Sequence, residues 1–229
     1  MLLKLASSSI GKKLLVGLTG LILVGFILGH MAGNLLVFLG PKAINEYGHM
    51  LHTMGHGMAV WVARAVIFGS IILHVVLTIQ LTKQNRAART ERYGFEATQV
   101  ATRSSRMMIV SGLTLLAFFI YHIMHFTVRA GTDFNSLTYD LDGVQVHNVY
   151  QMVINGFSVP AVSLFYIISM LFLSSHLSHG VASIPQTFGI NTEATGPLFK
   201  KLGYAFAALI LIGNCSIPIA IWLFGYGRS

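Results

Sequence analysis

Five apolar segments, each near the length that a helix needs to cross a bilayer, dominate this 229-residue chain. A helix of about 20 predominantly apolar residues spans the roughly 30 Å of hydrocarbon in a membrane. Chain inside lipid must be helical or part of a closed barrel, and these segments are too long and too little alternating for barrel strands. The sequence therefore predicts an all-α fold, an integral membrane bundle of five transmembrane helices. The helices are expected over 13–39, 59–82, 106–129, 152–178 and 201–225.

The composition supports a single membrane domain over residues 1–229. Charged residues make up 10% of the chain, whereas a soluble domain carries about 25%. The apolar run from Leu14 to Leu39 is too long for the core of a cleavable signal, which has roughly 7–15 residues. One cysteine, Cys215, excludes an internal disulfide, a Cys-x-x-Cys-His haem attachment and an all-cysteine iron–sulfur cluster. A cofactor would therefore need other ligands.

The distribution of positive charge predicts the orientation of the bundle. Cytoplasmic connectors of membrane proteins carry an excess of lysine and arginine. Eleven of the 15 such residues lie before the first segment, around the connector between the second and third, or before the fifth. We therefore expect a cytoplasmic membrane protein with its N-terminus inside and its C-terminus outside, and no nucleic-acid partner. The eleven are Lys4, Lys12, Lys13, Lys83, Arg86, Arg89, Arg92, Arg103, Arg106, Lys200 and Lys201.

Four histidines, His30, His74, His122 and His176, lie in the later halves of four different apolar segments. Because successive helices run in opposite directions, His30 and His122 share an outer depth, and His74 and His176 share an inner depth. At 1.5 Å per residue the two depths are about 15 Å apart. Histidine inside a bilayer is costly and usually functional, and haem iron takes axial ligands from opposite sides of its ring. The pattern predicts two bis-histidine b haems stacked across the membrane.

Alternative roles for these histidines remain open at the level of the residues. One transmembrane histidine alone can simply hydrogen-bond across a bundle, and His125 and His179, one turn beyond His122 and His176, are alternative ligands. A zinc site is a poor alternative, because zinc needs about four ligands in one shell and the histidines fall into two separated pairs. A transporter with a histidine proton relay is a further alternative, although the five segments contain no aspartate or glutamate.

Four cationic side chains are candidates for contacts with haem propionates. Arg64 lies one turn inside the outer end of the second segment and would suit the outer haem, unless it extends to the lipid headgroups. Arg103, Arg106 and His179 are the corresponding candidates for the inner haem. Anchoring of the arginines by the cytoplasmic headgroups explains them nearly as well.

At these residues the chain resembles the membrane anchor of succinate:quinone oxidoreductases, in the class with one five-helix subunit and two b haems. The resemblance covers almost the whole chain and is most specific in the fourth segment. It implies His122 rather than His125, and His176 rather than His179, as ligands, with His30 paired to His122 at the distal haem and His74 to His176 at the proximal haem. The matching stretches are His30-Met-Ala-Gly-Asn34, Ile72-Leu-His74, Ser111-Gly-Leu-Thr, Tyr121-His122, Tyr166 to Gly180 and Gln186 to Ile190.

The resemblance also implies partners and substrates that this chain does not contain. Such anchors dock a flavoprotein and an iron–sulfur subunit on the cytoplasmic face and pass electrons between them and a quinone, usually menaquinone. The dicarboxylate chemistry belongs to the partner, because the chain has no glycine fingerprint for a nucleotide and no soluble domain for flavin. Whether the chain counts as an enzyme therefore depends on its quinone site. Glu46 is the expected quinone-site residue, with Asn34 and His52 as companions.

Three further interpretations compete with the succinate:quinone anchor. The first is the b-type cytochrome anchor of a hydrogenase or a formate dehydrogenase, in which the ligands are distributed differently over the helices. The second is a haem-free, proton-coupled transporter. The third is a structural anchor with fewer haems. The motif in the fourth segment argues against the first interpretation, and visible absorbance discriminates against the second and the third.

Overall fold

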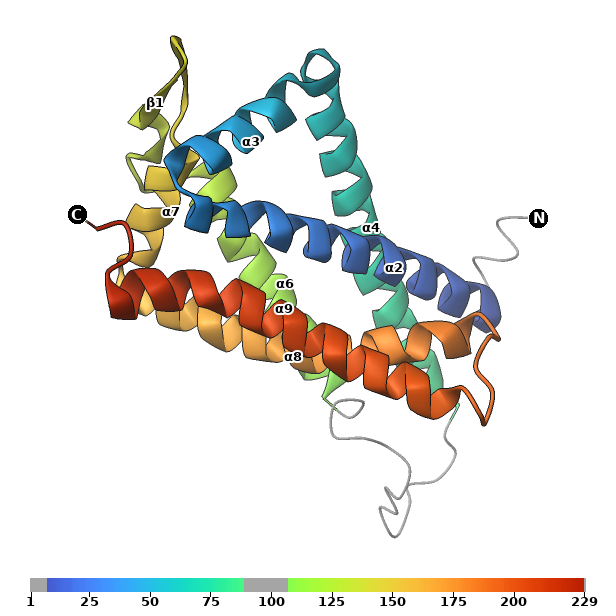
Figure 1. The fold of residues 1–229 in the computed structure, drawn as a ribbon. Helices are drawn as coiled ribbons and strands as arrows, with labels where there is room; N and C mark the ends of the chain where they lie inside the picture. Colours follow the sequence, from blue (N-terminus) through green and yellow to red (C-terminus); the bar gives the residue numbers. More distant parts are fainter. Residues whose placement is uncertain (1–7, 89–106, 229) are drawn as a thin grey trace.

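The computed structural model describes residues 8–88 and 107–228, and five helical segments of this part are long and apolar enough to cross a membrane (Figure 1). The predicted all-α membrane bundle is therefore confirmed. Each of the five spans overlaps one of the segments expected from the sequence. The long helices are α2 (Ser9–Asn34), α4 (Met58–Ala87), α6 (Met108–His122), α8 (Pro160–Thr187) and α9 (Gly196–Phe224).

The helices pack as an antiparallel bundle in which neighbours in sequence are mostly neighbours in space. Helix α8 lies along α9, α2 lies along α4, and α6 packs against α8. The first residue of α2, Ser9, and the last residue of α9, Phe224, lie at opposite ends of the bundle (Figure 1). These ends are called the Ser9 end and the hairpin end below.

Large apolar side chains cover the outside of the bundle. Trp61, Ile72 and Ile212 are each more than 60% exposed, at 62%, 62% and 69%. In water such a continuous apolar surface would favour association, whereas in a bilayer these side chains contact lipid. The interior contains glycine, serine, threonine and histidine among the aliphatic residues, as is usual where transmembrane helices pack closely. The predicted multi-pass membrane protein is thus confirmed.

The hairpin end carries a small layer of short elements. It consists of α3 (Pro41–Thr53), the strands β1 (Thr138–Leu141) and β2 (Val144–His147), and α7 (Val149–Phe157). The strands form an antiparallel hairpin in which Thr138 pairs with His147. Buried Asn45 of α3 joins the layer to α7: its amide donates to Asn148 Oδ1 at 3.2 Å and accepts from the Tyr150 backbone at 3.0 Å. This layer closes the end of the bundle at which α2 ends and α8 begins.

The fourth predicted helix differs from the structure at both ends. The expected span 152–178 covers part of α7 and only the first two thirds of α8, because the helical path is interrupted at Ser158 and Val159. Pro160 is the reason: proline disfavours α-helical geometry in the residue before it and starts a new helix at the first position. The hairpin of β1 and β2 was also not expected from the sequence.

Helix α6 ends in a wider turn directly after His122. Residues Ile123–Val128 form a π-helical segment, and Arg129 ends it with a left-handed backbone, φ 62°. Single π-turns in α-helices are rare and frequently lie at functional sites. The turn carries His125, which is buried, close to the end of α6.

Helices α8 and α9 approach each other closely at Gly203. A Cβ atom at this position would lie 2.7 Å from the backbone oxygen of Ser178 and 3.0 Å from Cβ of Ala182. The backbone of α8 cannot move away without separating from the rest of the bundle. Gly203 therefore sets the distance between the two helices.

We expect Gly203→Ala to destabilise the protein by about 1–3 kcal/mol, the usual cost of overpacking a tight interface. Gly180→Ala is the matched control, because a Cβ at Gly180 of α8 would meet nothing within 4 Å. The measurement is the unfolding midpoint of each purified variant in denaturing detergent. Equal midpoints for the two variants would contradict a close contact at Gly203.

Candidate functional site

The structure brings the imidazole rings of His30 on α2 and His122 on α6 close together. Their ring centroids are 5.7 Å apart and the ring planes are nearly perpendicular, at 88°. Phe26 stacks on the other side of His30 at 5.3 Å. Although rings flank it, His30 remains exposed, so protein atoms do not fill the space beside it.

Tyr166 of α8 contacts both His122 and His125. Its hydroxyl oxygen is 3.3 Å from Nδ1 of His122 and 3.2 Å from Nδ1 of His125. The His125 ring is enclosed by Phe126 and Phe134, with centroids 4.1 Å and 5.7 Å away. His122 contacts His30, whereas His125 lies among aromatic rings on the far side of Tyr166.

The other two histidines each meet a hydroxyl group of a neighbouring helix. Nδ1 of His74 on α4 lies 3.1 Å from Thr19 Oγ1 on α2. Nδ1 of His176 on α8 lies 3.2 Å from Ser111 Oγ on α6. Both hydroxyl residues are buried, with exposed fractions of 5% for Thr19 and 1% for Ser111. The second nitrogen, Nε2, is left for another partner in each ring.

A glycine follows each of these hydroxyl residues and lies against the same imidazole. A Cβ at Gly20 would be 3.5 Å from Cε1 of His74, and one at Gly112 would be 3.7 Å from Cε1 of His176. Cε1 lies between the two ring nitrogens, and Nδ1 of His74 would be 3.9 Å from the Cβ at Gly20. Each glycine therefore lets the backbone of one helix approach the imidazole of another closely.

Arg64 and Arg129 lie near each other, and Arg129 has an unpaired donor. Arg129 donates from one terminal nitrogen to Asn135 Oδ1 at 2.9 Å, while its buried Nε has no hydrogen-bond partner among the described residues. Burial and the nearby Arg64 guanidinium both lower the pKa of Arg129. A buried donor without a partner is costly, and two adjacent guanidinium groups favour an anion between them.

His147 of β2 lies near the same arginines. Burial first, and then the charges of Arg129 and His52, lower its pKa below the usual value of 6.5, while a hydrogen bond with the Leu137 backbone opposes this shift. Burial and the Arg129 charge therefore both disfavour the protonated form of His147.

Some predicted site residues are not brought together, and some lie outside the described part. Glu46 and His52 are exposed on α3, and His52 Nδ1 contacts the Gly48 backbone oxygen at 2.9 Å. Asn34 is half-buried at the end of α2. His179 is half-buried on α8, one turn beyond His176. Arg103 and Arg106 lie outside the described residues.

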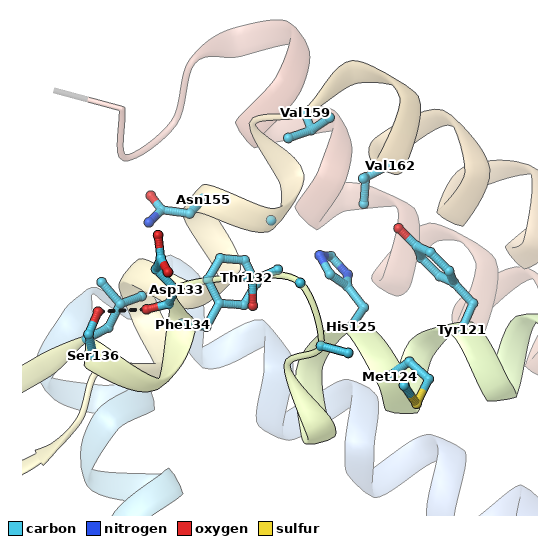
Figure 2. A pocket seen from close by; sticks show the side chains of 14 residues that line it. Tyr121, Met124, His125, Thr132, Asp133, Phe134, Ser136, Asn155, Val159 and Val162 are labelled. Atoms are coloured by element: carbon cyan, nitrogen blue, oxygen red, sulfur yellow. Dashed lines mark hydrogen bonds between the residues drawn. The ribbon is translucent and has the colours of Figure 1, made fainter.

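A cavity of about 570 Å³ opens beside the outer pair at the hairpin end (Figure 2). Its size lies within the roughly 300–1,000 Å³ typical of small-molecule sites. Figure 2 shows His125 between Tyr121 and the segment that carries Thr132 and Asp133. None of Glu46, Asn34 and His52 lines this cavity. The lining also includes Phe134, Asn155 and Val162.

The histidines do not form a multidentate cluster. In residues 8–88 and 107–228, no group of three or more His, Cys, Asp or Glu side chains is arranged to hold a metal ion. Two imidazoles from opposite sides are the ligand set of a bis-histidine haem. The adjacent rings of His30 and His122, on two different helices, match that ligand set.

Sequence reasoning missed Thr19, Ser111, Tyr166 and Arg129 as parts of this site. Thr19-Gly20 and Ser111-Gly112 share a hydroxyl–glycine pattern, which was the available signal. Their contacts with His74 and His176 depend on which helices are neighbours, and that is not visible in the order of residues.

Comparison with known proteins agrees with the fold. No protein-family profile and no solved structure matches the chain. The chain is similar to the succinate dehydrogenase cytochrome b558 subunit of Bacillus subtilis (strain 168), with 27% identity over 82% of this chain and 88% of that protein. The similarity covers most of both proteins. It agrees with the resemblance expected from the sequence: the chain is a membrane protein that is similar to a succinate dehydrogenase cytochrome b subunit.

Proposed function

We propose that the chain is the membrane-anchor cytochrome b subunit of a succinate dehydrogenase or fumarate reductase complex. It holds two b haems, the distal one between His30 and His122 and the proximal one between His74 and His176. Its partners are a flavoprotein and an iron–sulfur subunit on the cytoplasmic face, and its substrate is a quinone, of which menaquinone is the usual species. The name of the Bacillus subtilis relative supports the coarser part of this proposal.

The separation of His30 and His122 is the observation that carries the proposal. A bond between a metal and an imidazole nitrogen is about 2 Å long, so two imidazoles on opposite sides of one iron have ring centres roughly 6 Å apart. The observed 5.7 Å is close to this value. A direct imidazole–imidazole hydrogen bond would need neither the unfilled space beside His30 nor the second set of histidines on α4 and α8.

The surrounding residues also fit a haem at the outer pair. Arg64 and Arg129 supply positive charge, and the unpaired Nε of Arg129 is a donor for a carboxylate. Haem supplies one-electron transfer when it is bound. The chain holds the axial imidazoles at two depths within the bilayer, and it carries the anionic propionates on arginine.

We assign the dicarboxylate chemistry to the soluble partners. Electrons from succinate would then reach the chain through these partners, and the reverse path would serve fumarate. Reduction of a quinone to a quinol takes up two electrons and two protons. The chain contributes the site at which the quinone receives electrons from the side of His30 and His122 and protons from the outer surface.

The cavity beside His125 is the best candidate for the quinone headgroup. It has apolar walls, including Val162 and Phe134, together with polar groups of His125 and Asn155 for the two quinone oxygens. His125 is linked through the Tyr166 hydroxyl to His122, a proposed ligand of the distal haem. Glu46, Asn34 and His52 remain the sequence-based proposal and lie on other surfaces.

The anchor function is tested by fractionating cells that express the soluble subunits with and without this chain. We expect succinate dehydrogenase activity in the membrane fraction only when the chain is present. The matched control is the chain with Gly180→Ala, which is predicted to fold normally. Activity that remains soluble in the presence of the folded chain would contradict the proposed anchor role.

A further inference from the structure

The two inner histidines make the same contact with two different helices. Thr19 Oγ1 lies 3.1 Å from Nδ1 of His74, and Ser111 Oγ lies 3.2 Å from Nδ1 of His176. A glycine follows each of these two hydroxyl residues. The arrangement occurs once on α2 and once on α6. Because both His74 and His176 have this contact, it indicates a role in the pair that these two histidines form.

The proton of each hydroxyl group is already used by the backbone. Thr19 Oγ1 lies 2.8 Å from the Leu15 carbonyl and 3.1 Å from that of Val16. Ser111 Oγ lies 2.9 Å and 3.2 Å from the carbonyls of Met107 and Met108. A carbonyl only accepts, so the single hydroxyl proton points to the backbone and the lone pairs face the imidazole.

Where Nδ1 of an imidazole faces a lone pair of a hydroxyl oxygen, Nδ1 must carry the proton and donate the hydrogen bond. His74 and His176 therefore carry their protons on Nδ1, and Nε2 of each neutral ring keeps a lone pair for a metal. Donation from Nδ1–H also makes a ligating imidazole more basic. A more basic ligand favours the more highly charged, oxidised iron.

We propose that Thr19 and Ser111 are positioning residues that fix the Nδ1–H tautomer of His74 and His176 and lower the reduction potential of the haem between them. This inference rests on the proposed haem pair His74–His176 and adds a means by which the chain sets its potential. The outer pair is built differently, because His122 shares the Tyr166 hydroxyl with His125.

The test is a redox titration of the visible spectrum of the purified complex, with a haem count for each variant. Loss of an outer-shell partner changes metal affinity by roughly 10–100-fold. We expect Thr19→Val and Ser111→Ala each to favour the reduced proximal haem by about tenfold, which is about 59 mV for one electron. Thr19→Ser keeps the hydroxyl group and is expected to titrate like the wild type.

Two neighbouring threonines provide matched controls. Thr78 on α4 donates to the His74 and Val75 carbonyls at 2.8 Å and 2.9 Å, and Thr114 on α6 donates to the Val110 carbonyl at 2.9 Å. They make the same kind of backbone contact as Thr19 and Ser111. Thr78→Val and Thr114→Val are therefore expected to leave both potentials unchanged.

The possible outcomes separate this inference from the proposed function. Two haems with unshifted potentials in Thr19→Val and Ser111→Ala would overturn the inference and leave the haem proposal standing. If Thr19→Val loses the proximal haem and Thr19→Ser retains it, the hydroxyl group is required and the inference is supported. If both variants lose the proximal haem, the loss is a packing effect and the inference is overturned. A wild-type complex without haem would overturn the proposed function, and the inference with it.

Discussion

The variant His122→Ala is expected to retain one haem b where the wild type holds two. The structure places His122 opposite His30, so removing its imidazole leaves the outer position with one axial ligand. Electron transfer from the soluble subunits to quinone is expected to fall at least 100-fold, because the remaining haem lies roughly 15 Å deeper by helix rise. The measurement is a pyridine haemochrome count per chain, followed by the rate of quinone reduction by succinate.

His125→Ala is the matched control for this variant. His125 is on the same helix end, carries the same side chain and contacts the same Tyr166 hydroxyl, but it lies among phenylalanine rings rather than opposite His30. It is expected to retain both haems. One haem in His125→Ala together with two in His122→Ala would reverse the ligand assignment at the outer pair.

The variant Val162→Phe is expected to raise the KM for quinone about tenfold, which corresponds to about 1.4 kcal/mol. Val162 lines the cavity beside His125, and a benzyl group at this position would occupy part of the space proposed for the headgroup. Both haems and their potentials are expected to persist, because the substitution alters none of the four proposed histidine ligands. The measurement is steady-state quinone reduction with a soluble short-chain quinone.

Ile168→Phe on the same helix tests whether bulk alone has this effect. Ile168 is 43% exposed on the surface of α8 and does not line the cavity. Its substitution is expected to leave the KM for quinone unchanged. An unchanged KM in Val162→Phe would place the quinone elsewhere, and Glu46→Gln would then be the next variant to measure.

The spans were predictable from sequence because lipid imposes one requirement on the whole segment. Any helix that crosses the hydrocarbon must be long and apolar, so α2, α4, α6 and α9 were recognised from length and composition. The break before Pro160 was missed because α7 is as apolar as a span, and hydropathy does not register a change of direction. The β1–β2 hairpin lies in a polar connector, where only the local turn at Asp142 and Gly143, both with positive φ, specifies it.

The candidate site was predictable to a smaller extent. Histidines in a bilayer stand out, and alternating helix direction sorted them into two depths, with His30 and His122 adjacent in the structure. The residues behind the histidines depend on packing between helices distant in sequence. Thr19 is 55 residues from His74, and Ser111 is 65 residues from His176. Only the glycine that follows each of them distinguishes these hydroxyl groups from Thr78 and Thr114 in the local pattern.

The most direct test of the two-haem assignment is a redox-titrated visible spectrum of the purified wild-type protein with a pyridine haemochrome count. Two b haems per chain, titrating at two separate potentials, are the predicted result. A protein without haem would contradict the electron-transfer role of the four histidines. A single haem per chain would contradict one of the two pairs, and the haem counts of His122→Ala and His176→Ala would identify which.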